Sequence, residues 1–446
     1  MKINPAIFKA YDIRGLYPRE INEEVARRLG HGLAAFFKKK TAVVGYDARL
    51  SSRTLERELV RGLRESGVDV IRIGMVPTPV VSFAVLSFKA GIGVVVSASH
   101  SPRSYNAFKI IDERANQIGW EQGLTKIAGL MVKPATPSDE KGKAKTRRIL
   151  PLYRRFLIKK FKKRIKPLRI AIDYGNGVGA KTSRPILARL GIRAKHLFPE
   201  PDGRFPNHEP NPHEPKNFRW LQKELRQGTY DLGIFFDGDA DRAIFFDRWG
   251  NALRPDVSAG IMALALLKQH PGGEIYHDLR FSKAVIEEIR KAGGRPRRMP
   301  VGSPYYKDKI PESEHALLGA ELSGHVMFRD FWGIDDGLYA ALKMLECISK
   351  SRKHLDELAK PFLRYAQSGE ISIAAKDPED ALKQITQRFR GGKRSSLDGL
   401  SVEYPDWWFN VRASNTEPLL RLNVEARDQQ RLRRELATLL RSLKDA

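Results

Sequence analysis

Short apolar runs that end at an Asp-containing polar loop recur along the chain. The runs, with the aspartate that follows each, are residues 42–45 with Asp47, residues 170–172 with Asp173, and residues 275–276 with Asp278. Continuous apolar runs of this length are typical of buried strands, and Gly, Asn and Asp mark the turns after them. A segment with helical spacing of its apolar residues follows each run. The pattern therefore predicts three α/β units of related design.

A second apolar run in each unit ends in a loop that carries reactive side chains. These loops contain Ser99 and His100 in the first unit, residues 237–242 in the second and residues 321–325 in the third. Open α/β sheets build their sites at the carboxyl ends of strands. We therefore expect each unit to contribute one loop to a shared site.

The last part of the chain has a different pattern. Residues 380–389 have apolar positions at helical spacing, strand-like runs surround Val402 and Leu422, and a final helix begins at Asp428. This mixture predicts a small α+β domain.

The length of 446 residues is too great for one compact domain. The predicted fold class is α/β, with three similar mixed α/β domains and a smaller C-terminal α+β domain around a central cleft. The predicted domains cover residues 1–148, 149–250, 251–366 and 367–446.

Residues 237–242 read Asp-Gly-Asp-Ala-Asp-Arg between two apolar runs. Three carboxylates at alternate positions converge and repel one another unless a cation lies among them. Because oxygen ligands suit Mg²⁺, we expect Asp237, Asp239 and Asp241 to bind it. Arg242 and Arg248 occupy the positions where an EF-hand needs Gly and Glu, and a single Cys excludes a cysteine-based zinc site. An exposed acidic hairpin tip is the alternative.

Ser99 follows an apolar run and precedes a Ser-Pro pair that forces the chain out of the strand. Its hydroxyl is therefore expected at a strand's carboxyl end, with His100 and Lys109 close in sequence. An ordinary turn serine is the alternative for this position.

Three further segments carry binding chemistry. Residues 412–418, with Arg421 beyond them, combine guanidinium, hydroxyl and amide groups in a Pro-ended turn that suits a phosphate dianion. Residues 321–325 mix donors and acceptors, as paired sugar hydroxyls require. Arg14 precedes a Gly in residues 11–15. Each segment is also compatible with an exposed turn.

The net charge of +27 is unusual and raises nucleic acid or an anionic membrane as a partner. Residues 141–166 hold thirteen Lys or Arg and no acid, and apolar residues at 153, 156, 157, 161 and 165 predict a basic amphipathic helix. No aromatic-interleaved nucleic-acid motif accompanies it, so we expect a solvated surface helix.

Other features of composition indicate the compartment. There is no apolar stretch of about 18 residues, and the start lacks the apolar core of a signal peptide. The single Cys excludes an internal disulfide framework. We therefore expect a cytoplasmic protein without a transmembrane segment.

Five separated motifs together resemble the α-D-phosphohexomutase superfamily, most closely its bacterial-type phosphomannomutase/phosphoglucomutase branch. They occur in family order over nearly the whole chain, at residues 11–15, 97–102, 237–242, 321–325 and 412–418. Residues 201–208 also resemble a family segment.

The resemblance implies an isomerase that interconverts hexose 1-phosphate and hexose 6-phosphate by intramolecular phosphoryl transfer. It implies a phosphoserine at Ser99, Mg²⁺ held by the Asp residues and one phosphate oxygen, and hexose 1,6-bisphosphate as intermediate and activator. His100 and Lys109 would offset phosphate charge, and Lys109 or Arg14 would lie near the reacting hydroxyl as base. The implied substrate-binding residues are Arg242, Lys307, Glu321, Ser323, His325, Arg412, Ser414, Asn415, Thr416 and Arg421.

Some positions depart from the family pattern. Ser101 stands where Asn is usual, Ala107 where Gly is usual and Ala320 where Gly is frequent. Residues 302–304 read Gly-Ser-Pro in place of Gly-His-Ser, which puts one substrate contact in doubt, although Lys307 still matches. None of these changes removes the nucleophile or a metal ligand.

Alternative functions remain open at this point. Leu322 stands where acetylglucosamine-phosphate mutases usually carry Gln, which favours mannose or glucose as the hexose. A basic binding protein on a mutase scaffold would not need the intact Asp triad. A phosphatase with Asp237 as nucleophile would leave Ser99 unexplained. We expect a phosphosugar as the ligand, no obligatory nucleic acid, and a monomer or dimer.

Overall fold

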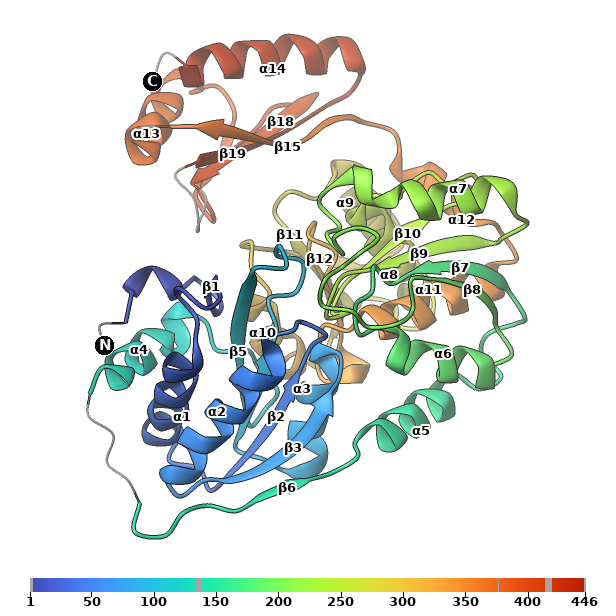
Figure 1. Ribbon diagram of the computed structural model, residues 1–446. Coiled ribbons are helices and arrows are strands. Elements are labelled where there is room, and N and C mark those ends of the chain that lie inside the picture. The colour runs from blue at the N-terminus through green and yellow to red at the C-terminus, as the bar shows by residue number, and fades with distance from the viewer. Residues whose placement is uncertain (1–2, 134–137, 376, 414–418, 445–446) are drawn as a thin grey trace.

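The computed structural model describes residues 3–133, 138–375, 377–413 and 419–444, which form four units along the chain (Figure 1). Each unit is built on a sheet of its own. None of the helices in these ranges has the length and apolar run needed to cross a bilayer.

The first unit is the largest. Its strands are β1 (Ile13–Leu16), β2 (Thr41–Tyr46), β3 (Asp69–Met75), β4 (Ile92–Val96), β5 (Tyr105–Asp112) and β6 (Ala144–Thr146). Its helices are α1 (Glu23–Phe37), α2 (Ser52–Glu65), α3 (Thr78–Phe88) and α4 (Thr125–Met131). The strand order is β1-β5-β4-β2-β3-β6.

The second and third units each have four strands. In the second unit the elements are β7 (Arg169–Asp173), β8 (Arg193–Leu197), β9 (Leu232–Phe236), β10 (Ala243–Phe246), α5 (Leu150–Phe161), α6 (Ala180–Arg189) and α7 (Arg219–Gln227). In the third unit they are α8 (Pro255–Leu267), β11 (Glu274–Asp278), α9 (Lys283–Lys291), β12 (Arg295–Met299), α10 (Pro304–Glu312), β13 (Ala316–Ala320), β14 (Val326–Phe328), α11 (Gly337–Ser351) and α12 (Leu355–Ala359).

One strand arrangement recurs in all three units. The orders β3-β2-β4-β5, β8-β7-β9-β10 and β12-β11-β13-β14 are equivalent. In each order, the second strand pairs in parallel with the first and the third, and the fourth strand returns antiparallel to the third. The recurrence confirms the predicted three related α/β units.

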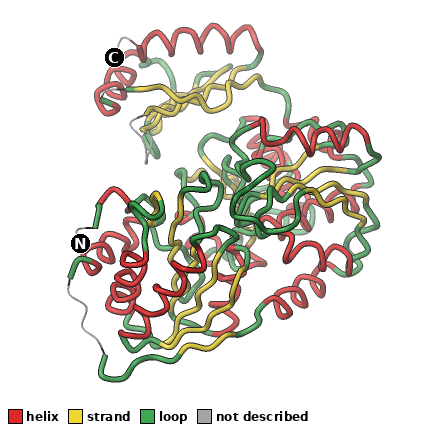
Figure 2. Tube along the Cα trace, viewed as in Figure 1, coloured by secondary structure: helices red, strands yellow, loops and turns green. Residues whose placement is uncertain are grey.

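The fourth unit is an antiparallel sheet covered by two helices. Its strands are β15 (Ala366–Ala374), β16 (Lys393–Ser395), β17 (Leu400–Glu403), β18 (Trp407–Ala413) and β19 (Leu419–Ala426), in the order β15-β19-β18-β17-β16. Its helices are α13 (Pro378–Arg388) and α14 (Gln429–Lys444). Figure 2 shows α14 on the face of this sheet that is turned away from the other units. This is the predicted α+β unit.

The buried apolar residues form separate clusters. Strand β4 shows the division, because Val94 faces a cluster drawn from residues 3–131 and Val95 faces a cluster that extends from residue 43 to residue 362. A strand buried on both faces explains the unbroken apolar run. The apolar cluster of the fourth unit is drawn from residues 381–443 and is distinct from both.

The basic helix is shorter than predicted. Tyr153, Leu157 and Phe161 are buried, as the spacing required, but α5 ends at Phe161 and not near Ile165. The chain leaves the helix at Lys162, whose ψ of 131° is extended, and Lys163 follows with a left-handed φ of +67°. The apolar pattern continues past this point because Ile165, outside the helix, packs against the cluster that extends from residue 43 to residue 362.

Candidate active site

In each of the first three units, the turn between the third and fourth strands carries one of the predicted loops. The turns join β4 to β5, β9 to β10, and β13 to β14, and contain Ser99, the three Asp residues and Glu321, respectively. Because the three units share one topology, these turns are equivalent by fold. Hydrogen bonds and ion pairs connect all three of them.

Ser99 is buried and held in an uncommon backbone conformation. Its φ is +50°, and Ser97 Oγ accepts its backbone N–H at 3.0 Å. The Ser99 hydroxyl donates to Asp237 Oδ2 at 2.7 Å, and Arg242 Nη2 donates to Ser99 Oγ at 2.6 Å. Strained backbone held by its surroundings is a feature of functional sites. The hydroxyl is thus aimed at the acidic loop of the second unit.

Arg49, just beyond β2, fixes the loop that carries Ser99. Its guanidinium donates to four backbone carbonyls, those of Ser99 (2.9 Å), Ser101 (2.5 Å), Pro102 (2.7 Å) and Tyr105 (3.0 Å). The side chain is buried, and Asp47 pairs with it at 3.2 Å. Only a guanidinium presents enough planar donors to hold these carbonyls together.

The three aspartates of the second unit are buried around two cations. Lys109 Nζ donates to Asp239 Oδ2 at 2.7 Å and to Asp241 Oδ2 at 2.6 Å. Arg242 pairs with Asp237 at 2.6 Å. Burial opposes the ionisation of Asp239 and Asp241, but the Lys109 ammonium keeps the pKa of both carboxyls below the ordinary value. Burial and the neighbouring carboxylates raise the pKa of Asp237.

The acidic loop fits a hard metal ion. One ligand oxygen from each of Asp237, Asp239 and Asp241 lies within 4.8 Å of the others. Asp239 Oδ1 and Asp241 Oδ1 are buried, and neither accepts a hydrogen bond within the described residues. Asp241 Oδ1 has only ion-pair contacts, at 3.5 Å from Arg242 Nε and His325 Nε2. A buried carboxylate oxygen such as Asp239 Oδ1, which accepts no hydrogen bond there, is costly unless a cation binds it. A three-carboxylate donor set suits Mg²⁺ by its chemistry.

His100 lies between Ser99 and the Arg242 guanidinium. Burial and the adjacent Arg242 guanidinium lower its pKa well below the ordinary value, so the ring is neutral near pH 7. Arg242 Nη2 donates to His100 Nδ1, which lies 3.2 Å from Ser99 Oγ. The positive charge next to Ser99 therefore comes from Arg242.

The third unit brings its loop against the three aspartates. His325 Nε2 lies 3.5 Å from Asp241 Oδ1, and His325 Nδ1 lies 3.1 Å from Glu321 Oε2 and 2.9 Å from Ser323 Oγ. Burial opposes protonation of His325, but the Asp241 carboxylate raises its pKa to about 9. Glu321 also accepts the backbone N–H of Gly302 at 2.8 Å. The loop therefore presents both donors and acceptors.

Two predicted cations lie at the edges of this cluster. Arg14 donates to Ser101 Oγ at 2.7 Å and pairs with Asp12 at 2.5 Å. Lys307 is buried and pairs with Asp335 at 2.9 Å. Arg14 is thus joined to the Ser99 loop, whereas Lys307 is held within the third unit.

The fourth unit approaches the site through a chain of charges. Arg280 Nη1 donates to Glu370 Oε2 at 2.6 Å, and Arg412 Nη2 lies 3.3 Å from the same oxygen. Arg421, on β19, donates to Ser372 Oγ. The predicted residues Ser414, Asn415 and Thr416 lie outside the described residues.

A cavity of about 410 Å³ lies where the second, third and fourth units meet, with Ser323, Arg280, Glu370 and His213 in its wall. His213 Nε2 accepts from Arg242 Nη1 at 3.2 Å, which links the cavity to the Ser99 side. The cavity volume is within the range of small-molecule sites.

Sequence reasoning did not select Arg49, Arg280 or His213. A signal was present for the first two, because each stands two residues after an aspartate, which is Asp47 just beyond β2 and Asp278 at the end of β11. Each of these aspartates accepts the arginine's backbone N–H. No local pattern distinguishes His213, whose contact with Arg242 joins residues that are distant in sequence.

Comparisons with known proteins agree with this geometry. The chain matches the four models of phosphoglucomutase/phosphomannomutase: the three alpha/beta/alpha domains at residues 5–135, 151–250 and 254–365, and the C-terminal domain at residues 370–442. Together these ranges cover most of the chain.

Similar proteins and a similar structure extend over the full length. The chain is 38% identical to "Phosphohexose mutases" of Xanthomonas campestris pv. campestris over 97% of this chain and 99% of that protein. It is 36% identical to the phosphomannomutase of Escherichia coli K12 over 94% of each chain. The crystal structure of a phosphoglucomutase/phosphomannomutase family protein from Burkholderia thailandensis matches with a TM-score of 0.92 and 32% identity, covering 100% of this chain and 98% of that one. The arrangement of loops, the full-length matches and the shared fold establish that this chain belongs to the phosphoglucomutase/phosphomannomutase family.

Proposed function

We propose that the protein is a phosphohexomutase, an isomerase that interconverts hexose 1-phosphate and hexose 6-phosphate with mannose or glucose as the hexose. The position of Ser99 Oγ carries the proposal, at 2.7 Å from Asp237 and 2.6 Å from Arg242 where the loops of the first and second units meet. The family to which the chain belongs supports the same reaction.

The proposed reaction transfers one phosphoryl group twice. Ser99 carries the group at rest. Its Oγ–P bond breaks while a bond forms from phosphorus to O6 of hexose 1-phosphate, and the O6 proton ends on the freed Ser99 hydroxyl. Lys109 and Arg14 are the expected neighbours of the reacting hydroxyl. Burial opposes the charge of Lys109, but Asp239 and Asp241 raise its pKa and hold it as an ammonium, so it supplies charge and not a base in this arrangement. The hexose 1,6-bisphosphate then reorients, and Ser99 takes the phosphoryl group from O1, which leaves hexose 6-phosphate. Added bisphosphate phosphorylates free Ser99 and so acts as an activator.

The side chains around Ser99 supply charge and position. Arg242 stabilises negative charge beside Ser99 Oγ, and Lys109 lies between two of the aspartates. Asp237, Asp239 and Asp241, with one phosphate oxygen, would hold Mg²⁺. When bound, Mg²⁺ supplies charge that offsets the charge of the transferring group. Phosphoryl transfer depends mainly on such positioning and charge stabilisation.

The remaining site residues are assigned to the sugar and to its second phosphate. Glu321, Ser323 and His325 provide the acceptors and donors for the sugar hydroxyls. Positive charge in the third and fourth units binds the phosphate that does not react. The residues proposed for phosphate and adjacent contacts are Arg242, Arg280, Lys307, Arg412, Ser414, Asn415, Thr416 and Arg421.

The test compares mannose 1-phosphate, glucose 1-phosphate and acetylglucosamine 1-phosphate with Mg²⁺ and catalytic bisphosphate. We expect turnover of the first two to exceed that of the third. Intact mass and peptide mapping should place a phosphate on Ser99 that is lost on incubation with hexose 6-phosphate. Ser99→Ala should lower the activity by at least about 10³, and Ser104→Ala, on an exposed position of the same loop, should not. Phosphate on another residue, or higher turnover of the acetylated sugar, would contradict the proposal.

A further inference from the structure

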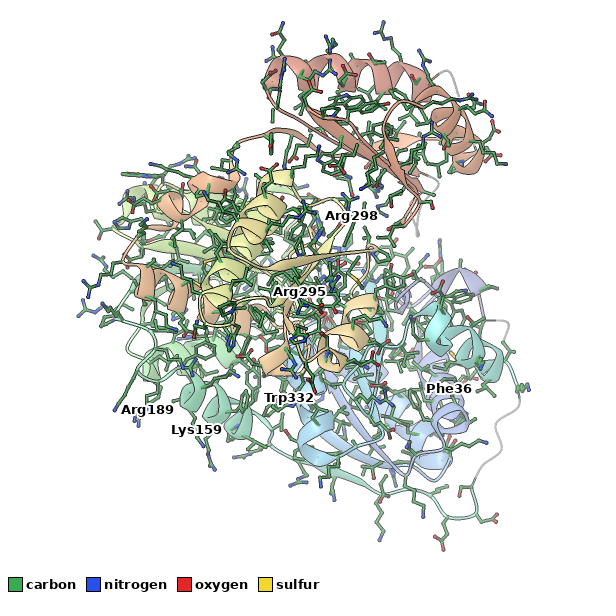
Figure 3. All side chains as sticks on the ribbon, turned by 180° about the vertical axis from the view of Figure 1, so that it is seen from behind. Phe36, Lys159, Arg189, Arg295, Arg298 and Trp332 are labelled. Atoms are coloured by element: carbon green, nitrogen blue, oxygen red, sulfur yellow. The ribbon has the colours of Figure 1, made fainter. Side chains whose placement is uncertain are left out.

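A second cavity, of about 390 Å³, lies between the third and fourth units and away from Ser99. One wall is α9 together with the edge strand β12, and the other is the hairpin of β16 and β17. Figure 3 shows Arg298, on β12, close to the fourth unit. None of the residues assigned above to the phosphosugar contributes to these walls.

The wall from the third unit is basic. Lys283, Ile286, Glu287 and Arg290 line the cavity from α9, and their spacing of three and four residues places them on one helical face. Arg298 lines it from β12.

Charged edge strands often serve to prevent aggregation, and β12 contains three arginines. Two of them are used elsewhere, because Arg295 donates to the Gly272 carbonyl and Arg297 pairs with Glu274 at 2.6 Å. Alternate residues of a strand point to opposite faces, so Arg298 faces the other way, with Pro296, into the cavity. Edge protection therefore does not account for Arg298.

The wall from the fourth unit adds more donors. Lys393 pairs in register with Glu403, and Ser395 with Ser401, and these four residues, with Arg394, all line the cavity. Glu403 is the one acid among these five residues, and the other four provide hydroxyl or cationic donors.

The acids of the cavity are already neutralised. Glu287 pairs with Arg364 at 2.6 Å, and Glu403 pairs with Lys283 at 3.2 Å. Arg290, Arg298 and Lys393 form no ion pair within the described residues. Burial lowers the pKa of His277 in the cavity wall to about 4, and Arg298 and Arg290 contribute to this. The cavity therefore has an excess of positive charge.

We propose that this cavity binds a small phosphorylated anion that bridges the third and fourth units. Guanidinium and ammonium groups on opposite walls, with hydroxyls between them, match an anion that has several oxygen acceptors. The volume is sufficient for a phosphorylated small molecule, and Tyr365 and Trp408 provide apolar surface for its remaining part. This cavity and the cavity beside Ser323 share only Trp408 in their walls.

The bridging anion also stabilises one orientation of the fourth unit. Arg412 and Arg421 belong to that unit, so occupancy of the cavity changes the affinity of the cleft for hexose phosphate. This last step rests on the proposed mutase function, whereas anion binding does not.

Inorganic pyrophosphate is the probe, and the first measurement is chemical acetylation of lysines followed by peptide mass spectrometry. At pyrophosphate near ten times Kd, we expect labelling of Lys393 to fall about tenfold by mass action, with Lys291, exposed on α9 outside the cavity, unchanged. Equal protection of Lys393 by sodium chloride at the same ionic strength would show charge screening only and would overturn the site.

Calorimetric titration separates this site from the cleft. We expect the R298Q/K393Q variant to bind one pyrophosphate fewer than the wild type, and R295Q, on the opposite face of the same strand, to bind as the wild type does. An unchanged stoichiometry in R298Q/K393Q would overturn the proposal.

Steady-state kinetics then test the coupling. In R295Q, pyrophosphate should change the KM for glucose 1-phosphate both by occupying the cavity and by competing in the cleft. In R298Q/K393Q, only the competition in the cleft should remain. The same KM response in both variants would overturn the coupling. Absence of any turnover would contradict the mutase function and leave the labelling and titration results intact.

Discussion

Three aspartates and two cations occupy one buried volume, and each charge is set by the others. Lys109 contacts two of the carboxylates, and Arg242 contacts the third. The desolvation cost of burying such a cluster is offset only while its positive and negative charges balance. Under the proposed function, Mg²⁺ would add positive charge and phosphorylation of Ser99 would add negative charge, so the two changes would offset each other.

Replacing Asp239 tests the metal site. Asp239→Asn removes one anionic ligand but keeps an oxygen that can accept from Thr78, whose hydroxyl donates to the carboxylate at 2.6 Å. We expect Mg²⁺ to raise the melting temperature of the wild type but not of this variant, whose activity should fall sharply. Asp231→Asn, at a carboxylate outside the cluster, is the control. A normal Mg²⁺ response in Asp239→Asn would refute the assignment.

Arg49 is a positioning residue whose effect is separable from substrate binding. Arg49→Lys leaves the positive charge but cannot reach four carbonyls, so we expect kcat to fall about 100-fold with little change in KM. Hydrogen exchange of residues 99–105 should become faster. Arg53→Lys, exposed on α2, should change neither quantity. A rise in KM at constant kcat would instead indicate direct substrate contact.

Single residues were predictable to different degrees. The motif around Asp237 was recognisable because three carboxylates at alternate positions require a cation. Arg49 and Arg280 could have been found from their shared spacing after Asp47 and Asp278. The neutral state of His100 was not predictable, because it depends on Arg242, which lies 142 positions away.

At the scale of elements, the sequence was most informative for strands. Strands β9 and β10 coincide with the apolar runs on either side of residues 237–242, because full burial leaves no polar position within them. Helix α5 was less well predicted. Its apolar spacing located the buried face, but the end of the helix depends on the backbone of Lys162 and Lys163, which the spacing does not encode.

The basic surface of α5 and the segment after it can be tested directly. Lys159, Lys162 and Lys163 are exposed, whereas Lys160 pairs with Asp330 at 3.1 Å and should be left in place. We expect the triple change of the exposed lysines to Gln to leave kcat/KM within about twofold at moderate salt, since such charges are screened. Arg421→Ala is the contrasting variant and should raise KM strongly. An equal loss in both would assign a role in catalysis to the helix.

At the scale of the whole molecule, the fourth unit packs as a body of its own. Its apolar cluster shares no residue with the other clusters, and ion pairs such as Arg280 with Glu370 and Lys283 with Glu403 link it to the third unit. The repeat pattern predicted the units, but not the basic cavity between the last two. That cavity arises from β12 and the β16–β17 hairpin, which are distant in sequence.

Calorimetry should resolve this division. Leu422→Ala removes a fully buried side chain from the fourth unit, and we expect it to lower one melting transition by about 10 °C and leave the other unchanged. Leu345→Ala, in the cluster that extends from residue 43 to residue 362, should lower only the transition that Leu422→Ala leaves unchanged. A single transition that both variants shift would contradict independent packing.

The cluster that extends from residue 43 to residue 362 constrains the order in which the chain folds as it leaves the ribosome. The N-terminal cluster is complete once residue 131 has emerged, but its neighbour waits for about 230 further residues. At synthesis rates of about 5 to 20 residues per second this interval is about 10 to 50 s. During it, the half-finished chain exposes one apolar face of a sheet whose other face is already covered. Nascent chains of this protein should therefore be clients of chaperones for that interval, and ribosome-bound chains halted near residue 250 should be captured more often than those halted after residue 370.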